Sequence, residues 1–182
     1  MKTTALLVID LQNEYLASGK LALSGIEQVA SNAQKIIDQA RQQGVHVIHV
    51  QHVATADSAI FVPDSAGIDF QDPVKPKAGE AVVVKQQINA FLNTSLKETL
   101  DRHQVSDLVV IGATSHMCID AVVRAAADFS YKVTVIHDAC ATLDLQFNGI
   151  QVPAAQVHAT MMAAFEFAYA QVMSTQDFLS QL

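Results

Sequence analysis

Near its start the chain reads Ala5-Leu6-Leu7-Val8-Ile9, an unbroken apolar run that Asp10 ends. A strand that is apolar at every position must be covered on both faces, which is typical of a parallel sheet between two layers of helices. Residues 26–40 follow with apolar side chains at helical spacing, and Gly44 marks the end of that pattern. This part of the chain therefore predicts a strand followed by an amphipathic helix.

The same alternation continues along the rest of the chain. Apolar runs predict further strands at 45–50, 81–84, 108–111, 133–136 and 171–173, and helical patterns predict helices at 94–102, 118–129, 153–169 and after Ser174. Asn93 and Ser174 are suited to be helix N-caps. Strands that alternate with helices specify the α/β class with a mainly parallel sheet.

The length and one long loop complete this outline. At 182 residues the chain is expected to form one domain, residues 1–182. Residues 52–80 show no clear period and are interrupted by three prolines, at 63, 73 and 76. A loop this long in a compact domain is usually functional.

Composition excludes several classes of partner. The 11 basic and 18 acidic residues give a formal net charge of −7, which argues against nucleic acid or an anionic membrane as a partner. Only 16% of the residues are charged, so we expect another subunit to cover part of the surface. The sequence shows neither a signal-peptide pattern nor an apolar run of the ~20 residues that a membrane span needs. Two cysteines make no disulfide framework, and we expect a cytoplasmic protein.

Reactive side chains follow three of the predicted strands. Asp10 ends the first strand, Lys85 ends the third, and Cys118 opens the helix after the fourth. Ligands bind outside the carboxyl ends of the strands in such sheets, so all three should face one crevice. Each also has an ordinary interpretation: an aspartate in a turn, a solvated lysine and a packed cysteine. Cys140 is expected to be a packing residue.

Together these three residues predict nucleophilic chemistry. A thiolate forms more readily at a helix N-terminus and beside a cation, and Lys85 could be that cation for Cys118. Asp10 could take the thiol proton and pass it to a leaving group. Backbone amides of the turn before Cys118 could form an oxyanion hole.

Four segments carry a resemblance to a known family, the isochorismatase-like cysteine hydrolases. They are residues 6–15, 83–96, 112–120 (Gly-Ala-Thr-Ser-His-Met-Cys-Ile-Asp) and 137–139 (His-Asp-Ala). The family includes nicotinamidases and N-carbamoylsarcosine amidases, and this chain looks most similar to uncharacterised or streptothricin-hydrolase-like members.

The resemblance implies a fold and a set of site residues. It implies a Rossmann-like, three-layer fold with a six-stranded parallel sheet of order 3-2-1-4-5-6, flanked by helices. It implies the catalytic triad Asp10, Lys85 and Cys118, a cis peptide bond before Thr114, and an oxyanion hole formed by the amides of Thr114 and Cys118. It also implies a homodimer or homotetramer.

Further residues are candidates for contact with a small-molecule substrate. Gln12, Tyr15, Asn89 and His116 lie near the motif positions, and the alternative for each is an ordinary polar residue at the end of an element or in a turn. Nicotinamidases of the family hold a metal through an Asp-x-His pair, and residues 49–55 contain no such pair. We therefore expect neither a metal nor a cofactor.

The expected function is hydrolysis of a C–N bond in a small amide, lactam or ureide through a thioester on Cys118. The presence of this cysteine favours acyl transfer. Two alternatives stay open. One is vinyl-ether hydrolysis with Asp10 as the acid, and the other is a non-catalytic binding or redox-sensing module with a low-pKa Cys118.

Overall fold

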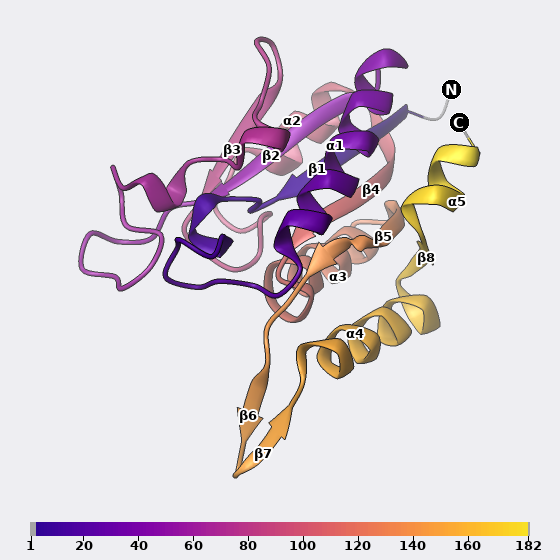
Figure 1. Cartoon of the computed structure of the whole chain (residues 1–182). Helices are drawn as coiled ribbons and strands as arrows, with labels where there is room; N and C mark the ends of the chain where they lie inside the picture. The colour runs from indigo at the N-terminus through magenta and orange to yellow at the C-terminus, as the bar shows by residue number, and fades with distance from the viewer. Residues whose placement is uncertain (1–2, 182) are drawn as a thin grey trace.

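A computed structural model describes residues 3–181 of the chain (Figure 1). Its main sheet has six parallel strands in the order β3-β2-β1-β4-β5-β8. They are β1 (Thr3–Ile9), β2 (His46–His52), β3 (Ala81–Lys85), β4 (Val105–Ala113), β5 (Lys132–Ala141) and β8 (Ala170–Met173). This confirms the predicted α/β fold and sheet order. The sixth strand of the sheet is β8 because a separate two-stranded hairpin comes before it.

The helices cover both faces of the sheet. On one face lie α1 (Ile26–Gln42) and α5 (Thr175–Ser180), and on the other lie α2 (Leu96–Arg102), α3 (Asp120–Asp128) and α4 (Ala154–Ala168). Side chains of β1 alternate between the two cores: Leu6 packs with the α1 layer and Leu7 with the α3 layer. Both are almost fully buried, as are their neighbours in residues 5–9, which explains why this part of β1 has no polar position.

The hairpin of β6 (Leu145–Phe147) and β7 (Ile150–Val152) was not predicted. It extends away from the sheet and helices, at the bottom of Figure 1. Asn148 and Gly149 join its strands with positive φ angles of 50° and 79°, as a tight hairpin turn requires. This Asn-Gly pair was the available signal, but strands of three residues give too short a pattern to recognise.

Three short 3₁₀ helices lie in the connections: η1 (Asn13–Tyr15), η2 (Ala66–Ile68) and η3 (Asp72–Val74). Two helix starts differ from the prediction. The α2 helix begins after Ser95, since Asn93 adopts a left-handed φ of 56° and does not cap it. The segment Ser115–Ile119 forms a π-helical turn before α3, where we had expected one continuous helix from Cys118.

The N-cap of α5 is as predicted, because the Ser174 hydroxyl accepts a hydrogen bond from the Asp177 N–H. None of the helices formed by residues 3–181 has the length and apolarity that a membrane crossing requires.

Candidate active site

Asp10, Lys85 and Cys118 lie together at the carboxyl ends of β1, β3 and β4. The Lys85 Nζ is 2.8 Å from Asp10 Oδ2 and donates a hydrogen bond of 3.3 Å to Cys118 Sγ. All three side chains are buried, with exposures of 0–5%. The fold therefore assembles an acid, a cation and a thiol from three separate strand ends.

The backbone around the site adopts unusual conformations. Asp10 has a φ of 52°, in the left-handed region that aspartate tolerates better than most residues do. Gly112 has a φ of 129°, and a Cβ there would lie 2.0 Å from the carbonyl oxygen of Ile9. Only glycine therefore lets β4 pass β1 at this point. The peptide bond between Ala113 and Thr114 is cis.

The electrostatics of the site favour a neutral thiol in the absence of substrate. Burial, and then the negative charge of Asp10, raise the pKa of Cys118 to about 12, although Lys85 acts in the opposite direction. The sequence had led us to expect a lowered pKa, because it reveals the lysine but not the depth of burial. A thiol of this kind needs a base at the moment of reaction.

Asp10 is placed to be that base. Both of its carboxylate oxygens are buried, and within residues 3–181 neither accepts a hydrogen bond of good geometry, although Oδ2 contacts the Lys85 ammonium. Burial alone would lower the pKa of Lys85, but the charges of Asp10 and Cys118 outweigh it and the pKa is raised. Lys85 therefore stays charged, and its positive charge compensates the negative charge of Asp10.

A cavity of about 260 Å³ gives access to the thiol. Cys118, Thr114, Tyr15, His52 and His116 line it. The rest of its wall is apolar and is formed by Leu21, Ile60, Phe61, Ile88, Met117 and Leu143. The cavity lies where the sequence predicted the crevice, and residues 60 and 61 of the long loop form part of it.

Of the four residues that we expected to contact substrate, two line the cavity and two do not. Tyr15 and His116 line the cavity. Gln12 does not, because its amide donates to the carbonyls of His52 and Ile68 and accepts from the His52 N–H, tying β1 to the long loop. Asn89 is not part of the lining either, and its side chain accepts a hydrogen bond from the Phe91 N–H within a turn.

His52 is a site residue that sequence reasoning missed. Its Nδ1 lies 3.0 Å from Lys85 Nζ, and His52 and Lys85 are register partners at the ends of β2 and β3. Burial, and then the charge of Lys85, lower its pKa. The signal was its position, since it ends the second strand as Lys85 ends the third.

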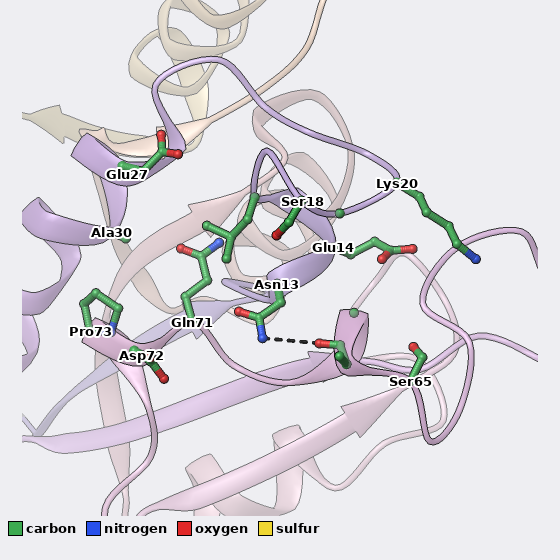
Figure 2. Close-up of a pocket in the computed structure, with 14 residues that line it drawn as sticks. Asn13, Glu14, Ser18, Lys20, Glu27, Ala30, Ser65, Gln71, Asp72 and Pro73 are labelled. Carbon is green, nitrogen blue, oxygen red and sulfur yellow. Dashed lines mark hydrogen bonds between the residues drawn. The ribbon is translucent and has the colours of Figure 1, made fainter.

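A larger hollow of about 610 Å³ lies beside the site (Figure 2). Asn13 lines it and donates to the Ala66 carbonyl, the contact dashed in Figure 2. Glu14 also lines it, and its buried carboxylate accepts a hydrogen bond from the N–H of Phe61. Glu14 therefore links this hollow to the cavity beside Cys118, because it bonds to Phe61 and shares η1 with Tyr15.

Among residues 3–181, no group of three or more histidine, cysteine or acidic side chains is arranged to hold a metal ion. His49, the first residue of the segment compared with nicotinamidases, is paired with Glu80 at 3.0 Å. The Arg41 guanidinium donates two further hydrogen bonds to that carboxylate. These groups fasten the end of the long loop to α1 and β2.

Comparison with known proteins gives a consistent assignment. The Isochorismatase domain matches residues 4–177. The uncharacterised isochorismatase family protein YddQ of Bacillus subtilis is 46% identical over 97% of this chain and 99% of its own length. A streptothricin hydrolase of Streptomyces noursei is 35% identical over 78% of this chain and 50% of its own length.

A solved structure agrees with the sequence matches. The crystal structure of an isochorismatase-type hydrolase from Oleispira antarctica superposes with a TM-score of 0.96 at 50% identity, covering 98% of this chain and 97% of the other. The strand order, the matched length and these relatives agree, and the chain belongs to the isochorismatase family of hydrolases.

Proposed function

We propose that this protein is a cysteine hydrolase that cleaves a C–N bond of a small amide, lactam or ureide through a thioester on Cys118. The observation that carries the proposal is the position of the Lys85 ammonium, which contacts both the Asp10 carboxylate and the Cys118 sulfur beside an open cavity. A nucleophile, a base and a cation are thereby held within reach of one bound carbonyl group.

The first half of the reaction forms the thioester. Asp10 takes the thiol proton as Cys118 Sγ bonds to the carbonyl carbon, so the thiolate never has to exist free in its buried site. The backbone N–H groups of Thr114 and Cys118 stabilise the negative oxygen of the tetrahedral intermediate. The C–N bond then breaks, and Asp10 returns the proton to the departing nitrogen.

The second half releases the acid. A water molecule gives a proton to Asp10 and its oxygen bonds to the thioester carbon. The C–S bond breaks, and Asp10 returns the proton to the sulfur, so the site regains its starting state. Lys85 keeps its charge throughout, which stabilises the sulfur anion whenever it develops and orients the carboxylate.

The relatives of this chain support the amide and ureide class. They include proteins named nicotinamidase in Escherichia coli and ureidoacrylate amidohydrolase in Acinetobacter baylyi.

Mass spectrometry of the intact protein tests the proposal. The protein is mixed with a panel of small amides, lactams and ureides and quenched in acid within the first turnovers. We expect ammonia or amine release, and an acyl adduct on the peptide that carries Cys118. Turnover of an enol ether by the Cys118→Ala variant would favour the vinyl-ether reaction instead, and a complete absence of turnover and adduct would favour a sensor.

We also propose that the protein is a cytoplasmic homodimer or homotetramer. Both cysteines are free thiols, which suits a reducing compartment. Phe147 and Ile150 of the hairpin and Phe167 of α4 are 81%, 64% and 91% exposed in the single chain. Exposed apolar side chains of this size are typical of subunit contacts. Sedimentation velocity should show an assembly, and a monomer at micromolar concentration would contradict this part of the proposal.

A further inference from the structure

We propose that the natural substrate of this site is a small, uncharged carboxamide with an apolar acyl group, rather than an amide or ureide that carries a carboxylate. This inference rests on the proposed function and adds the chemical class of the group that the cavity accepts. It is carried by the size of the cavity, by its lining and by the engagement of Lys85, the one ammonium group that residues 3–181 place at the site.

The cavity is small and apolar. Its volume of about 260 Å³ is below the range of roughly 300–1,000 Å³ that is usual for sites of drug-sized ligands, which favours a small substrate. Ile60, Phe61 and Leu143 present hydrocarbon surface to it. The Phe61 ring packs edge-on against Tyr15 and His52 at centroid distances of 5.3 and 5.1 Å. A hydrocarbon wall stabilises an apolar group and offers nothing to a charged one.

The Lys85 ammonium already contacts three partners within the protein. The Lys85 ammonium has three protons, and it contacts Asp10 Oδ2, His52 Nδ1 and Cys118 Sγ at 2.8, 3.0 and 3.3 Å. Its side chain is completely buried beneath these partners. A substrate carboxylate would therefore find no free ammonium here, and it would also meet the negative charge of Asp10.

A second lysine nearby in the chain is directed elsewhere. Lys20 precedes the cavity-lining Leu21, but it lines the larger hollow (Figure 2) and donates to the carbonyl of Ala59. Every residue in the cavity lining is aliphatic, aromatic, hydroxyl-bearing, sulfur-bearing or histidine, so no lysine or arginine belongs to it.

The two histidines of the lining are neutral hydrogen-bonding groups. Because Lys85 donates to Nδ1 of His52, the ring proton of His52 is on Nε2. Burial lowers the pKa of His116 as well, and its Nδ1 is 2.6 Å from the Thr142 hydroxyl. Both rings can orient a neutral polar atom of the substrate, such as the amide group, without supplying a positive charge.

Matched substrates test this inference with the wild-type protein. Hexanamide and succinamate have the same number of non-hydrogen atoms and differ in the carboxylate, and so do butylurea and N-carbamoylglycine. We expect kcat/KM for the neutral member of each pair to exceed that for the anionic member by about 100-fold or more, because an unpaired buried charge is costly. Equal or better cleavage of the anionic members would overturn the inference and leave the proposed function intact.

A charge placed at the rim should change this preference. Ile88 lines the cavity and is 39% exposed, so Ile88→Arg adds a cation that can reach the ligand. We expect the ratio of succinamate to hexanamide cleavage to rise by about tenfold, as one charge pair allows. Val84→Arg is the matched control, because Val84 is 53% exposed on β3 and is not part of the lining. An unchanged ratio in Ile88→Arg, or the same rise in Val84→Arg, would contradict the inference.

A binding measurement tests this inference independently of the proposed hydrolysis reaction. If no amide is cleaved and no adduct forms, the proposed function fails. Thermal unfolding of the Cys118→Ser variant then decides whether the cavity recognises neutral amides. A rise in Tm with hexanamide but not with succinamate supports the inference, and the absence of a rise with hexanamide overturns it.

Discussion

The two cysteines of this protein have similar burial and different neighbours. Cys118 follows β4, and Cys140 lies in β5 opposite Gly112. Each is 5% exposed, and burial is the main reason that the pKa of each thiol is raised to about 12. Cys118 has the Lys85 ammonium at 3.3 Å and lines the cavity. Cys140 interacts instead with the backbone of Gly112 and is further disfavoured as an anion by Asp138.

This difference is the reason that we propose Cys118, and not Cys140, as the nucleophile. Neither burial nor the resting pKa distinguishes the two thiols. Each thiol has a carboxylate nearby, and the distinguishing features of Cys118 are the neighbouring Lys85 ammonium and an open path to the sulfur. Cys140 has no part in that arrangement, and it is not among the residues that line the cavity. The comparison can be tested directly, because each cysteine is the control for the other.

The largest expected difference is between the activities of the Cys118→Ala and Cys140→Ala variants. Cys118→Ala should lower kcat by at least about 10³-fold, since no other group in the lining can form the thioester. Cys140→Ala should leave turnover close to that of the wild-type protein and cost about 1–2 kcal/mol of stability through the small cavity it leaves. Amine release and urea unfolding measure these effects. Full activity in Cys118→Ala would show that the comparison is wrong.

The charges beside Cys118 should have the next largest effect. Asp10 and Lys85 form a buried pair with completely buried side chains, so Asp10→Asn or Lys85→Met alone should cost about 3–5 kcal/mol of stability and remove activity. The double variant should recover most of that stability while staying inactive, because it leaves no buried charge unpaired. Urea unfolding of the three variants measures this.

A surface pair is the control for this experiment. Arg102 and Glu98 are 2.8 Å apart with side chains 64% and 74% exposed, and Arg102→Met should cost less than about 1 kcal/mol. Activity in the double variant would mean that the pair is structural only.

The sequence predicted the sheet and the place of the triad for a clear physical reason. Apolar runs identify buried strands, and the carboxyl ends of parallel strands must meet, so Asp10, Lys85 and Cys118 could be placed together without coordinates. The prediction of a low thiol pKa failed because burial depends on the complete packing around Cys118. Gln12 stays a predicted substrate contact, and only the path of the long loop reveals that its amide is bonded to the Ile68 carbonyl. His52 was overlooked, although the pairing of β2 with β3 places it beside Lys85.

A hydroxyl links the surroundings of the two cysteines. Ser115, in the turn that carries Cys118, donates to the carbonyl of Ala141 next to Cys140, and its oxygen is 2.8 Å from His158 Nδ1. Ser115→Ala should cost about 1–3 kcal/mol, because it leaves these buried partners unsatisfied. It should also lower kcat more than it changes KM, since it loosens the turn that positions the thiol.

The control for Ser115 is another hydroxyl on the same side of the molecule. Thr160 donates to the Gln156 carbonyl within α4 and is exposed, so Thr160→Ala should change neither stability nor kcat appreciably. A Ser115→Ala variant that lost stability but kept the wild-type kcat would show that the turn does not depend on this link.

Alkaline pH should produce the smallest effect. Both folded thiols have a pKa near 12 against an ordinary value of 9.0, so the unfolded chain releases these protons first as pH rises. The stability that a raised thiol pKa provides is therefore complete below pH 9.0 and declines above it, by at most about 1.4 kcal/mol per pH unit for each thiol. The unfolding measurements are informative only up to about pH 10.5, because lysines begin to lose their protons there. Urea unfolding under reducing conditions should show a shallower decline in Cys118→Ala and in Cys140→Ala alike. If the decline of stability with pH in one variant equalled that of the wild-type protein, the thiol removed would ionise as easily in the folded as in the unfolded chain. The two cysteine sites would then differ in burial as well as in their neighbours.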